Sequence, residues 1–268
     1  RASRRGRRRR RRARLGARLL AGARALPLER ILAVLVAVVC AGSVMAIGSV
    51  HITTMLVVGA FATLALFTAW LLGFGDRDKL PVFGPALLCW ALAGWSALQL
   101  VPLPMSWLAT LAPVNADIWS RALLPWGDGP PALAPISLDP GATWVEVLRW
   151  HSYAAMFTAS ATLAARRGVV WGATLVFVVA LAAGTMTVGH GLLGLRQVYG
   201  LYQPSFQVHP WHVGPLLNAN NLAGLLNVGV FCGLGLVATR QPPAPRWALA
   251  IGVAVVLAVS ITAASRNN

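Results

Sequence analysis

The side chains best suited to bind or transform a ligand are concentrated in one stretch of an apolar chain. Residues 196–224 carry one arginine, two histidines, two tyrosines and three asparagines, although 57% of the chain is hydrophobic. Arginine can hold a diphosphate through bidentate, charge-assisted hydrogen bonds, and histidine can accept a proton from an attacking hydroxyl. Polar groups placed in lipid cost free energy, so a segment that concentrates them is a candidate functional site.

The composition around this stretch is that of a membrane protein. The mean hydropathy is +0.66, only 11% of the residues are charged, and several apolar runs approach twenty residues, about the length that crosses roughly 30 Å of hydrocarbon. The net charge of +16 does not indicate a nucleic-acid partner, because 13 of the 23 Lys and Arg lie in residues 1–30 without groove-reading structure. The three cysteines share no metal-ligand spacing.

We therefore predict an all-α fold, a polytopic transmembrane helix bundle of about seven spans. Residues 1–30 are a low-complexity basic arm, and residues 31–268 form the bundle. The chain begins with Arg and ends just after an apolar run, so we expect it to be truncated at its C-terminus. The predicted spans are 31–50, 52–74, 80–101, 144–165, 169–189, 216–238 and 247–264.

Loop charge predicts the orientation of the bundle. If the arm is cytoplasmic, the loops 75–79, 166–168 and 239–246 are cytoplasmic too, and together with the arm they hold 19 of the 23 Lys and Arg. This distribution follows the positive-inside rule. The tight join at His51 would then be a very short outer turn. We predict a multi-pass membrane protein with a cytoplasmic N-terminus.

The outer side of this topology has a long loop, residues 102–143, that we expect to contain amphipathic helices lying in the membrane interface. A passive cap on the bundle is the alternative. The apolar residues that suggest interfacial helices are Trp107, Leu108, Leu111, Ile118, Trp119 and Leu123.

The same topology gathers basic and amide side chains on the outer face, which suggests a mouth that recognises an anion. The sequence shows no metal-ligand spacing, glycine-rich phosphate loop or paired carboxylates, so we predict no metal and no cofactor. The gathered residues are Arg149, His151, His190, Arg196, His209, His212, Asn218, Asn220, Asn221 and Arg266.

Several of these residues also have structural interpretations. Glu146 and Arg149 are three residues apart and can pair on one helix face. A histidine near a helix end, such as His190, can be a hydrogen-bonding residue rather than a catalyst. Asparagines can join helices within a membrane, and the pair Gly229 and Gly233 suits close helix packing.

Three passages, in this order, resemble the O-antigen ligase and polymerase family of bacterial envelope glycosyltransferases. They are LQLVPLP at 98–104, ISLDPGATW at 136–144, and GLLGLRQVYG followed by VGPLLNANNLAGLL up to residue 226. Ser265 and Arg266 are similar to the start of the family's Ser-Arg-Gly motif. The last long passage carries the family's glycine and asparagine pattern at Gly214, Leu216, Asn218, Asn220 and Ala223.

This resemblance implies a metal-free inner-membrane enzyme. Its partners would be membrane lipids, an undecaprenyl diphosphate-linked glycan and an acceptor glycolipid or growing glycan on the periplasmic face. Family members commonly place an arginine before the glycine matching Gly214, where this chain has Trp211 and His212. We predict catalytic roles for His212 and Arg266. We predict substrate-binding roles for Arg149, Arg196, His209, Asn218, Asn220 and Asn221, and of these the resemblance implies that Arg196 contacts the diphosphate and that Asn218 and Asn220 shape the site.

Two other classes remain open on the sequence. A transporter or flippase-like protein could use the same polar mouth to bind a lipid-linked anion, and an inverted internal repeat would favour it. A structural membrane scaffold would tolerate alanine at the arginines and asparagines with no effect beyond stability.

Overall fold

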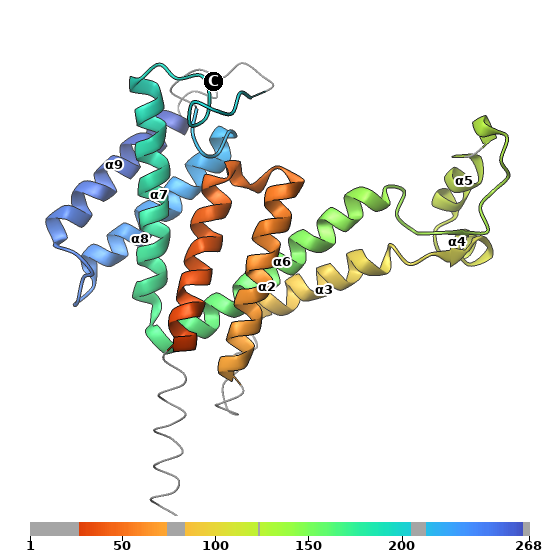
Figure 1. Ribbon diagram of the computed structural model, residues 1–268, viewed down its shortest axis with the longest axis horizontal. Coiled ribbons are helices and arrows are strands. Elements are labelled where there is room, and N and C mark those ends of the chain that lie inside the picture. The colour runs from red at the N-terminus through yellow and green to blue at the C-terminus, as the bar shows by residue number, and fades with distance from the viewer. Residues whose placement is uncertain (1–26, 74–83, 123, 205–212, 265–268) are drawn as a thin grey trace, which may run out of the picture. The chain divides into compact units, whose positions relative to one another are not determined.

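The computed structural model describes residues 27–73, 84–122, 124–204 and 213–264 and shows a helical protein (Figure 1). The predicted all-α class is confirmed, with one small addition: β1 and β2 form a two-stranded antiparallel piece in which Leu103 faces Ala134. The elements are the helix Pro27–Met45, η1 (Ile47–Ser49), α2 (Ile52–Gly73), α3 (Gly84–Leu98), β1 (Leu103–Pro104), α4 (Met105–Leu111), α5 (Pro113–Ala122), η2 (Leu124–Trp126), β2 (Leu133–Ala134), α6 (Pro140–Arg167), α7 (Val169–Leu192), α8 (Ala219–Ala238) and α9 (Arg246–Ala264).

Four helices among the described residues are long and apolar enough to cross a membrane, judged by length and composition. They are Pro27–Met45, α2, α7 and α8. The apolar stretches Gly84–Leu98 and Arg246–Thr262 are shorter, and α6 is not among the four. Each of the seven predicted spans overlaps a helix, but the count of seven stays a prediction.

The end of the first helix differs from the sequence expectation. The helix includes residues 27–30, which the sequence placed in the basic arm, and it ends at Met45 rather than at Val50. Ile47, Gly48 and Ser49 all have positive φ angles, 57°, 65° and 55°. Three consecutive left-handed residues cannot continue a right-handed helix, so the chain turns back into α2 within residues 46–51.

The chain divides into two compact units. The first unit comprises Arg1–Pro81 and Ala159–Asn268, and the second comprises Val82–Thr158. Helix α6 begins in the second unit and ends in the first.

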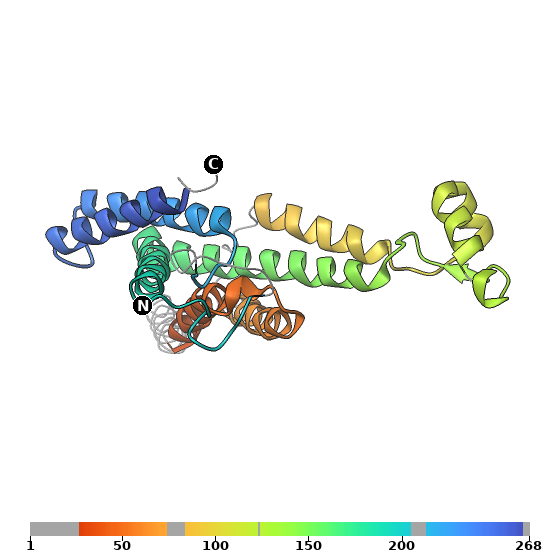
Figure 2. The ribbon, with the colours of Figure 1, turned by 90° about the horizontal axis from the view of Figure 1, so that it is seen from above.

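The core of the first unit lies between α7, α8 and α9, and the last two lie side by side (Figures 1 and 2). Two glycines on α8 let this helix approach α7 and α9 closely. A Cβ on Gly229 would stand 2.3 Å from the Ala180 Cβ, and one on Gly233 would meet Val253 and Phe177 at 2.5 and 2.6 Å. The predicted role of these two glycines in packing is confirmed. Small residues at helix contacts are the usual solution in membranes, where lipid is as apolar as leucine.

One polar bond also joins α8 and α9. The Ser260 hydroxyl donates to Asn227 Oδ1 at 2.7 Å, and Ser260 is buried. A polar group within apolar helices needs such an internal partner.

The second unit contains a small folded module between α3 and α6. Leu108, Ala116 and Ala134 form its buried core, and Trp119 packs against them. The Asn115 side-chain amide donates to the Ile136 carbonyl at 2.6 Å. Because the loop has its own core and tertiary hydrogen bonds, it is an ordered structure with one buried and one exposed face.

The exposed face of this module is apolar. Trp107 on α4 is 63% exposed, and Leu111 on the same helix is 66% exposed. Val114 and Ile118, four residues apart on α5, are exposed as well. Of the apolar residues that the sequence picked out, Leu108 and Trp119 therefore point inward, and Leu123 lies outside the described residues.

Candidate functional site

The candidate site lies at one end of the first unit, where residues 45–51, 190–204 and 213–221 meet. We call these residues the polar end. Figure 1 shows the end of α7, the turn before α2 and the start of α8 at the same end of this unit, uppermost in the view. The side chain of Leu216 lies against this turn, because a Cβ on Gly48 would stand 2.8 Å from it.

Helix α7 ends in a Schellman motif. The Leu195 N–H donates to the His190 carbonyl at 2.9 Å, the Gly194 N–H donates to the Gly191 carbonyl at 3.3 Å, and Gly194 has a φ of 64°. This pattern satisfies helix-end carbonyls and needs a left-handed residue, which glycine adopts without strain. The motif directs the chain out of the helix just before Arg196.

His190, in the last turn of α7, has both ring nitrogens engaged. Nδ1 lies 2.8 Å from the Met186 carbonyl, and Nε2 lies 3.0 Å from the backbone nitrogen of Tyr199. A carbonyl can only accept and a backbone N–H can only donate, so the ring is neutral with its proton on Nδ1. His190 is buried. It is therefore a structural hydrogen-bonding residue, as one of its two interpretations held, and in this arrangement neither nitrogen can act as a base.

Tyr199 links α7 to the first helix. Its backbone N–H donates to His190, and its phenol donates to the carbonyl of Met45, the last residue of the first helix. The last carbonyls of a helix have no intrahelical N–H partner, so the Tyr199 phenol provides the donor that the Met45 carbonyl lacks. Partial burial raises the pKa of Tyr199, which keeps the phenol protonated and donating. We call Met45, His190 and Tyr199 the clamp.

The clamp fixes a backbone conformation that L-residues rarely adopt. Tyr199 has a φ of 56°, followed by Gly200 at 70°, and the Leu201 N–H donates to the Val198 carbonyl at 3.0 Å. Left-handed non-glycine residues cost about 1–3 kcal/mol and persist only where the surroundings fix them. The hydrogen bonds of the Tyr199 backbone and side chain do this. Tyr202 adds an edge-on ring contact with His51, at 5.4 Å between centroids.

The start of α8 is built by Asn218. Its side-chain oxygen accepts from the backbone N–H groups of Asn220 and Asn221, at 2.9 and 3.4 Å, which makes it the N-cap of the helix. Asparagine is among the preferred residues there because it satisfies donors that the helix leaves unpaired. The cap uses only the oxygen of Asn218, so the side-chain N–H₂ is not part of it.

The backbone before α8 packs directly on α7. A Cβ on Gly214 would stand 2.5 Å from the Thr187 hydroxyl oxygen, so only glycine fits at this contact. Pro204 and Val213, on either side of the segment 205–212, are both buried. The loop is thus fixed to the unit at both flanks of this segment.

Arg196 is the exposed arginine of the polar end. The ion pairs among the described residues join Arg121 to Asp117, Arg149 to Glu146 and Arg167 to Glu29. Arg196 makes none with a described carboxylate, and the residue is exposed. With the N-terminus of α8 at the same end, this cation gives the polar end an electrostatic preference for an anion.

The remaining candidate residues lie in the second unit or outside the described residues. Arg149 lies on α6 in the second unit and pairs with Glu146, which confirms the predicted pairing on one helix face. His151, in the same unit, stacks edge-on against Trp90 with 5.2 Å between ring centroids. The candidates His209, His212 and Arg266 lie outside the described residues. The polar end therefore unites Arg196 with Asn218, Asn220 and Asn221.

The opposite end of the first unit is cationic. The Arg166 guanidinium donates to the Leu72 carbonyl at the end of α2, and Arg167 pairs with Glu29 at 2.8 Å. Arg246 donates to the carbonyls of Val237 and Thr239 at the end of α8. Arg166 and Arg246 thus cap carbonyl ends of helices, where positive charge is favourable. The contacts place the starts of the first helix and α7 beside the ends of α2 and α6.

Sequence reasoning identified Arg196 and the asparagines but not the clamp. The local sequence signal for a turn there is Gly200, because glycine adopts positive φ angles without strain. Met45, the partner of Tyr199, lies 154 residues away, and no local pattern links the two.

Chemically, the polar end offers an exposed arginine, amide side chains and a helix N-terminus, a set that suits a phosphate-bearing ligand. Within the described ranges, no three His, Cys, Asp or Glu side chains cluster as a metal site would need. Comparisons of the chain with protein-family models, with curated proteins and with solved structures find no match.

Proposed function

We propose that this chain acts in the transfer of a glycan from undecaprenyl diphosphate to an acceptor glycolipid or growing glycan, on the periplasmic face of a bacterial inner membrane. The class of enzyme is the O-antigen ligase and polymerase family, which the three passages resemble. The observation that carries the proposal is the polar end, because its one exposed arginine and the N-cap of α8 fall within the longest of those passages.

The distribution of charge supports the orientation. The two ends of the first unit differ in charge: arginines cap helices at one end, and the other end holds Arg196 together with neutral polar residues. The positive-inside rule puts the arginine-rich end in the cytoplasm. The polar end then faces the periplasm, where a lipid-linked glycan exposes its diphosphate and sugar.

In the proposed reaction, the acceptor hydroxyl attacks the anomeric carbon and the lipid diphosphate leaves with the bonding electrons. Arg196 would contact the diphosphate and stabilise the charge that grows on it, which is often the largest contribution in such transfers. The side-chain N–H₂ of Asn218 is a further donor at the same end. His190 does not take part in proton transfer, because its nitrogens hold the clamp.

In the proposed topology the module of the second unit belongs to an outer loop, residues 102–143. Its exposed Trp107 and Leu111 suit the headgroup layer, where tryptophan is enriched. At the membrane surface, the exposed apolar face of α4 and α5 would contact lipid rather than water. The proposed topology also keeps the predicted seven spans, with the module between the third and the fourth.

Replacing Arg196 by glutamine should slow glycan transfer by about tenfold to a hundredfold. A charged hydrogen bond to the leaving diphosphate is worth about 1.5–3 kcal/mol, and glutamine keeps polarity but loses the charge. The measurement is the initial rate of transfer by the purified chain in proteoliposomes, with a polyprenyl diphosphate-linked glycan and its acceptor. Arg240→Gln is the matched control, because Arg240 is also exposed but belongs to the loop between α8 and α9, and its rate should stay within twofold.

Equal transfer rates for Arg196→Gln and Arg240→Gln would show that Arg196 does not belong to the site. Absence of transfer by the unchanged chain, together with movement of the lipid across the bilayer, would favour the flippase-like alternative.

A further inference from the structure

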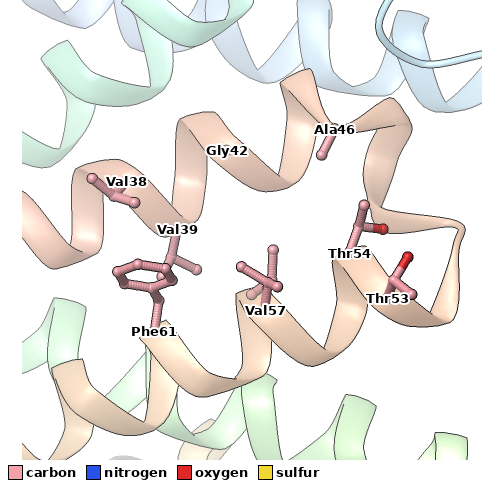
Figure 3. Close-up of a pocket in the computed structure, with 9 residues that line it drawn as sticks. Val38, Val39, Gly42, Ala46, Thr53, Thr54, Val57 and Phe61 are labelled. Carbon is pink, nitrogen blue, oxygen red and sulfur yellow. The ribbon is translucent and has the colours of Figure 1, made fainter.

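An apolar groove runs between the first helix and α2. Its volume is about 340 Å³, and Figure 3 shows side chains of the two helices facing each other across it. Along the chain it extends from Val38 on the first helix to Ala46 just after it, about 12 Å at 1.5 Å per residue. The lining residues are Val38, Val39, Gly42, Ala46, Thr53, Thr54, Val57, Val58 and Phe61.

The groove owes its width partly to Gly42. A Cβ at this position would meet no atom within 4 Å, so the protein leaves the space next to it open. Valines and Phe61 make up most of the walls, and an apolar cavity without polar partners does not hold ordered water. Both walls are helices long and apolar enough to cross a membrane. The natural occupant of the groove is therefore a hydrocarbon chain.

One end of the groove opens at the polar end. Ala46, Thr53 and Thr54 line this part, next to the turn of residues 46–51. The loop that carries Arg196 is fixed to the same turn, since Tyr199 donates to Met45 and Tyr202 contacts His51. A lipid whose chain occupies the groove thus has its headgroup beside the loop of Arg196. The charge of Arg196 favours an anionic headgroup.

We propose that the groove holds the isoprenoid chain of the lipid-linked diphosphate, next to its headgroup. This inference rests on the proposed function, which supplies the donor, and it adds the place where the chain binds. The groove is short compared with a polyprenyl chain, so it takes the first isoprene units and leaves the rest in the bilayer. The chain in the groove then brings the diphosphate to Arg196.

Filling the groove tests the proposal. Gly42→Phe places a ring in the open space, and Gly235→Phe is the matched control, because a Cβ on Gly235 also meets no atom within 4 Å but lies on α8, away from the groove. The probes are undecaprenyl diphosphate and uncharged undecaprenol, measured as dissociation constants with the full chain in nanodiscs. We expect Gly42→Phe to raise the dissociation constants of both lipids by about tenfold. Gly235→Phe should change neither dissociation constant by more than twofold.

Arg196→Gln separates this inference from the proposed function. This variant should weaken the binding of undecaprenyl diphosphate but not the binding of undecaprenol, because undecaprenol has no charge. If Arg196→Gln has that effect while Gly42→Phe has none, the donor site stands and the groove is not its chain site. If neither lipid binds the unchanged chain, the proposed function fails as well.

Two further outcomes would overturn the groove assignment. One is equal displacement of undecaprenol by phosphatidylglycerol at matched concentration, which would make the groove a general site for phospholipid chains. The other is a Gly42→Phe chain that dimerises less than the unchanged one, which would make the groove a contact between copies. If Gly42→Phe does not fold, Gly42→Leu provides a smaller filling side chain for the same measurements.

Discussion

Replacing Gly229 by leucine is expected to destabilise the first unit by at least about 3 kcal/mol. Even the first carbon of the new side chain would stand 2.3 Å from the Ala180 Cβ, with Val256 on the other side at 3.6 Å. Overpacking a close contact costs about 1–3 kcal/mol for added methylenes, and here the backbone of α8 must also move away from α7. Since the packing of α7, α8 and α9 forms the core of this unit, its loss affects the whole unit.

Gly235→Leu provides the control on the same helix. Gly235 is exposed, and a Cβ there meets no atom within 4 Å, so leucine should have little effect or stabilise the helix slightly. The measurement is the temperature at which half of the detergent-solubilised protein stops eluting as a monodisperse species. At about 2–4 °C per kcal/mol for a chain of this size, Gly229→Leu should lower it by roughly 6 °C or more. Equal midpoints for the two variants would show that α7 and α8 are not in close contact.

Replacing His190 by alanine should release the loop that carries Arg196. The change removes the acceptor of the Tyr199 N–H and the donor to the Met186 carbonyl. Leaving buried polar groups unpaired costs about 1–3 kcal/mol, and the left-handed conformation of Tyr199 loses one of the bonds that fix it. The loop should then exchange its amide hydrogens at least tenfold faster, as measured by mass spectrometry on a peptide covering residues 195–204.

His51→Ala is the matched control for this prediction. His51 belongs to the polar end and touches Tyr202 only through an edge-on ring contact, which contributes about 0.5–1.5 kcal/mol. Its effect on exchange should be smaller than that of His190→Ala. If the two variants behaved alike, or if His190→Ala left exchange unchanged, the clamp would not determine the position of the loop.

The helices could be predicted from the sequence because the apolar runs are long and their breaks carry charge or proline. The pair of Glu146 and Arg149 followed from a spacing of three, and the packing role of Gly229 and Gly233 from a spacing of four. These features depend on residues close in the chain, whose geometry a helix fixes by itself.

The clamp, the left-handed turn and the groove could not be predicted in this way. The bond from Tyr199 to Met45 joins parts of the chain far apart in sequence. The positive φ of Ile47 contradicts the local preference of a β-branched residue. The open space beside Gly42 depends on how two helices pack, and the sequence shows only a glycine. For the site, Arg196 was found because it is a charge in an apolar context, whereas His190 required the structure to show that both ring nitrogens are engaged.

The central claim is that the polar end faces the periplasm, and labelling of two cysteines tests it most directly. Gln203 lies in the loop after α7, Gln241 lies between α8 and α9, and both are exposed. Each would be replaced by cysteine in a chain whose Cys40, Cys89 and Cys232 have been changed to alanine. A membrane-impermeant maleimide should label Gln203→Cys in intact spheroplasts and Gln241→Cys only after lysis. Labelling of Gln241→Cys in intact spheroplasts, with Gln203→Cys protected, would place the polar end in the cytoplasm and contradict the proposed site.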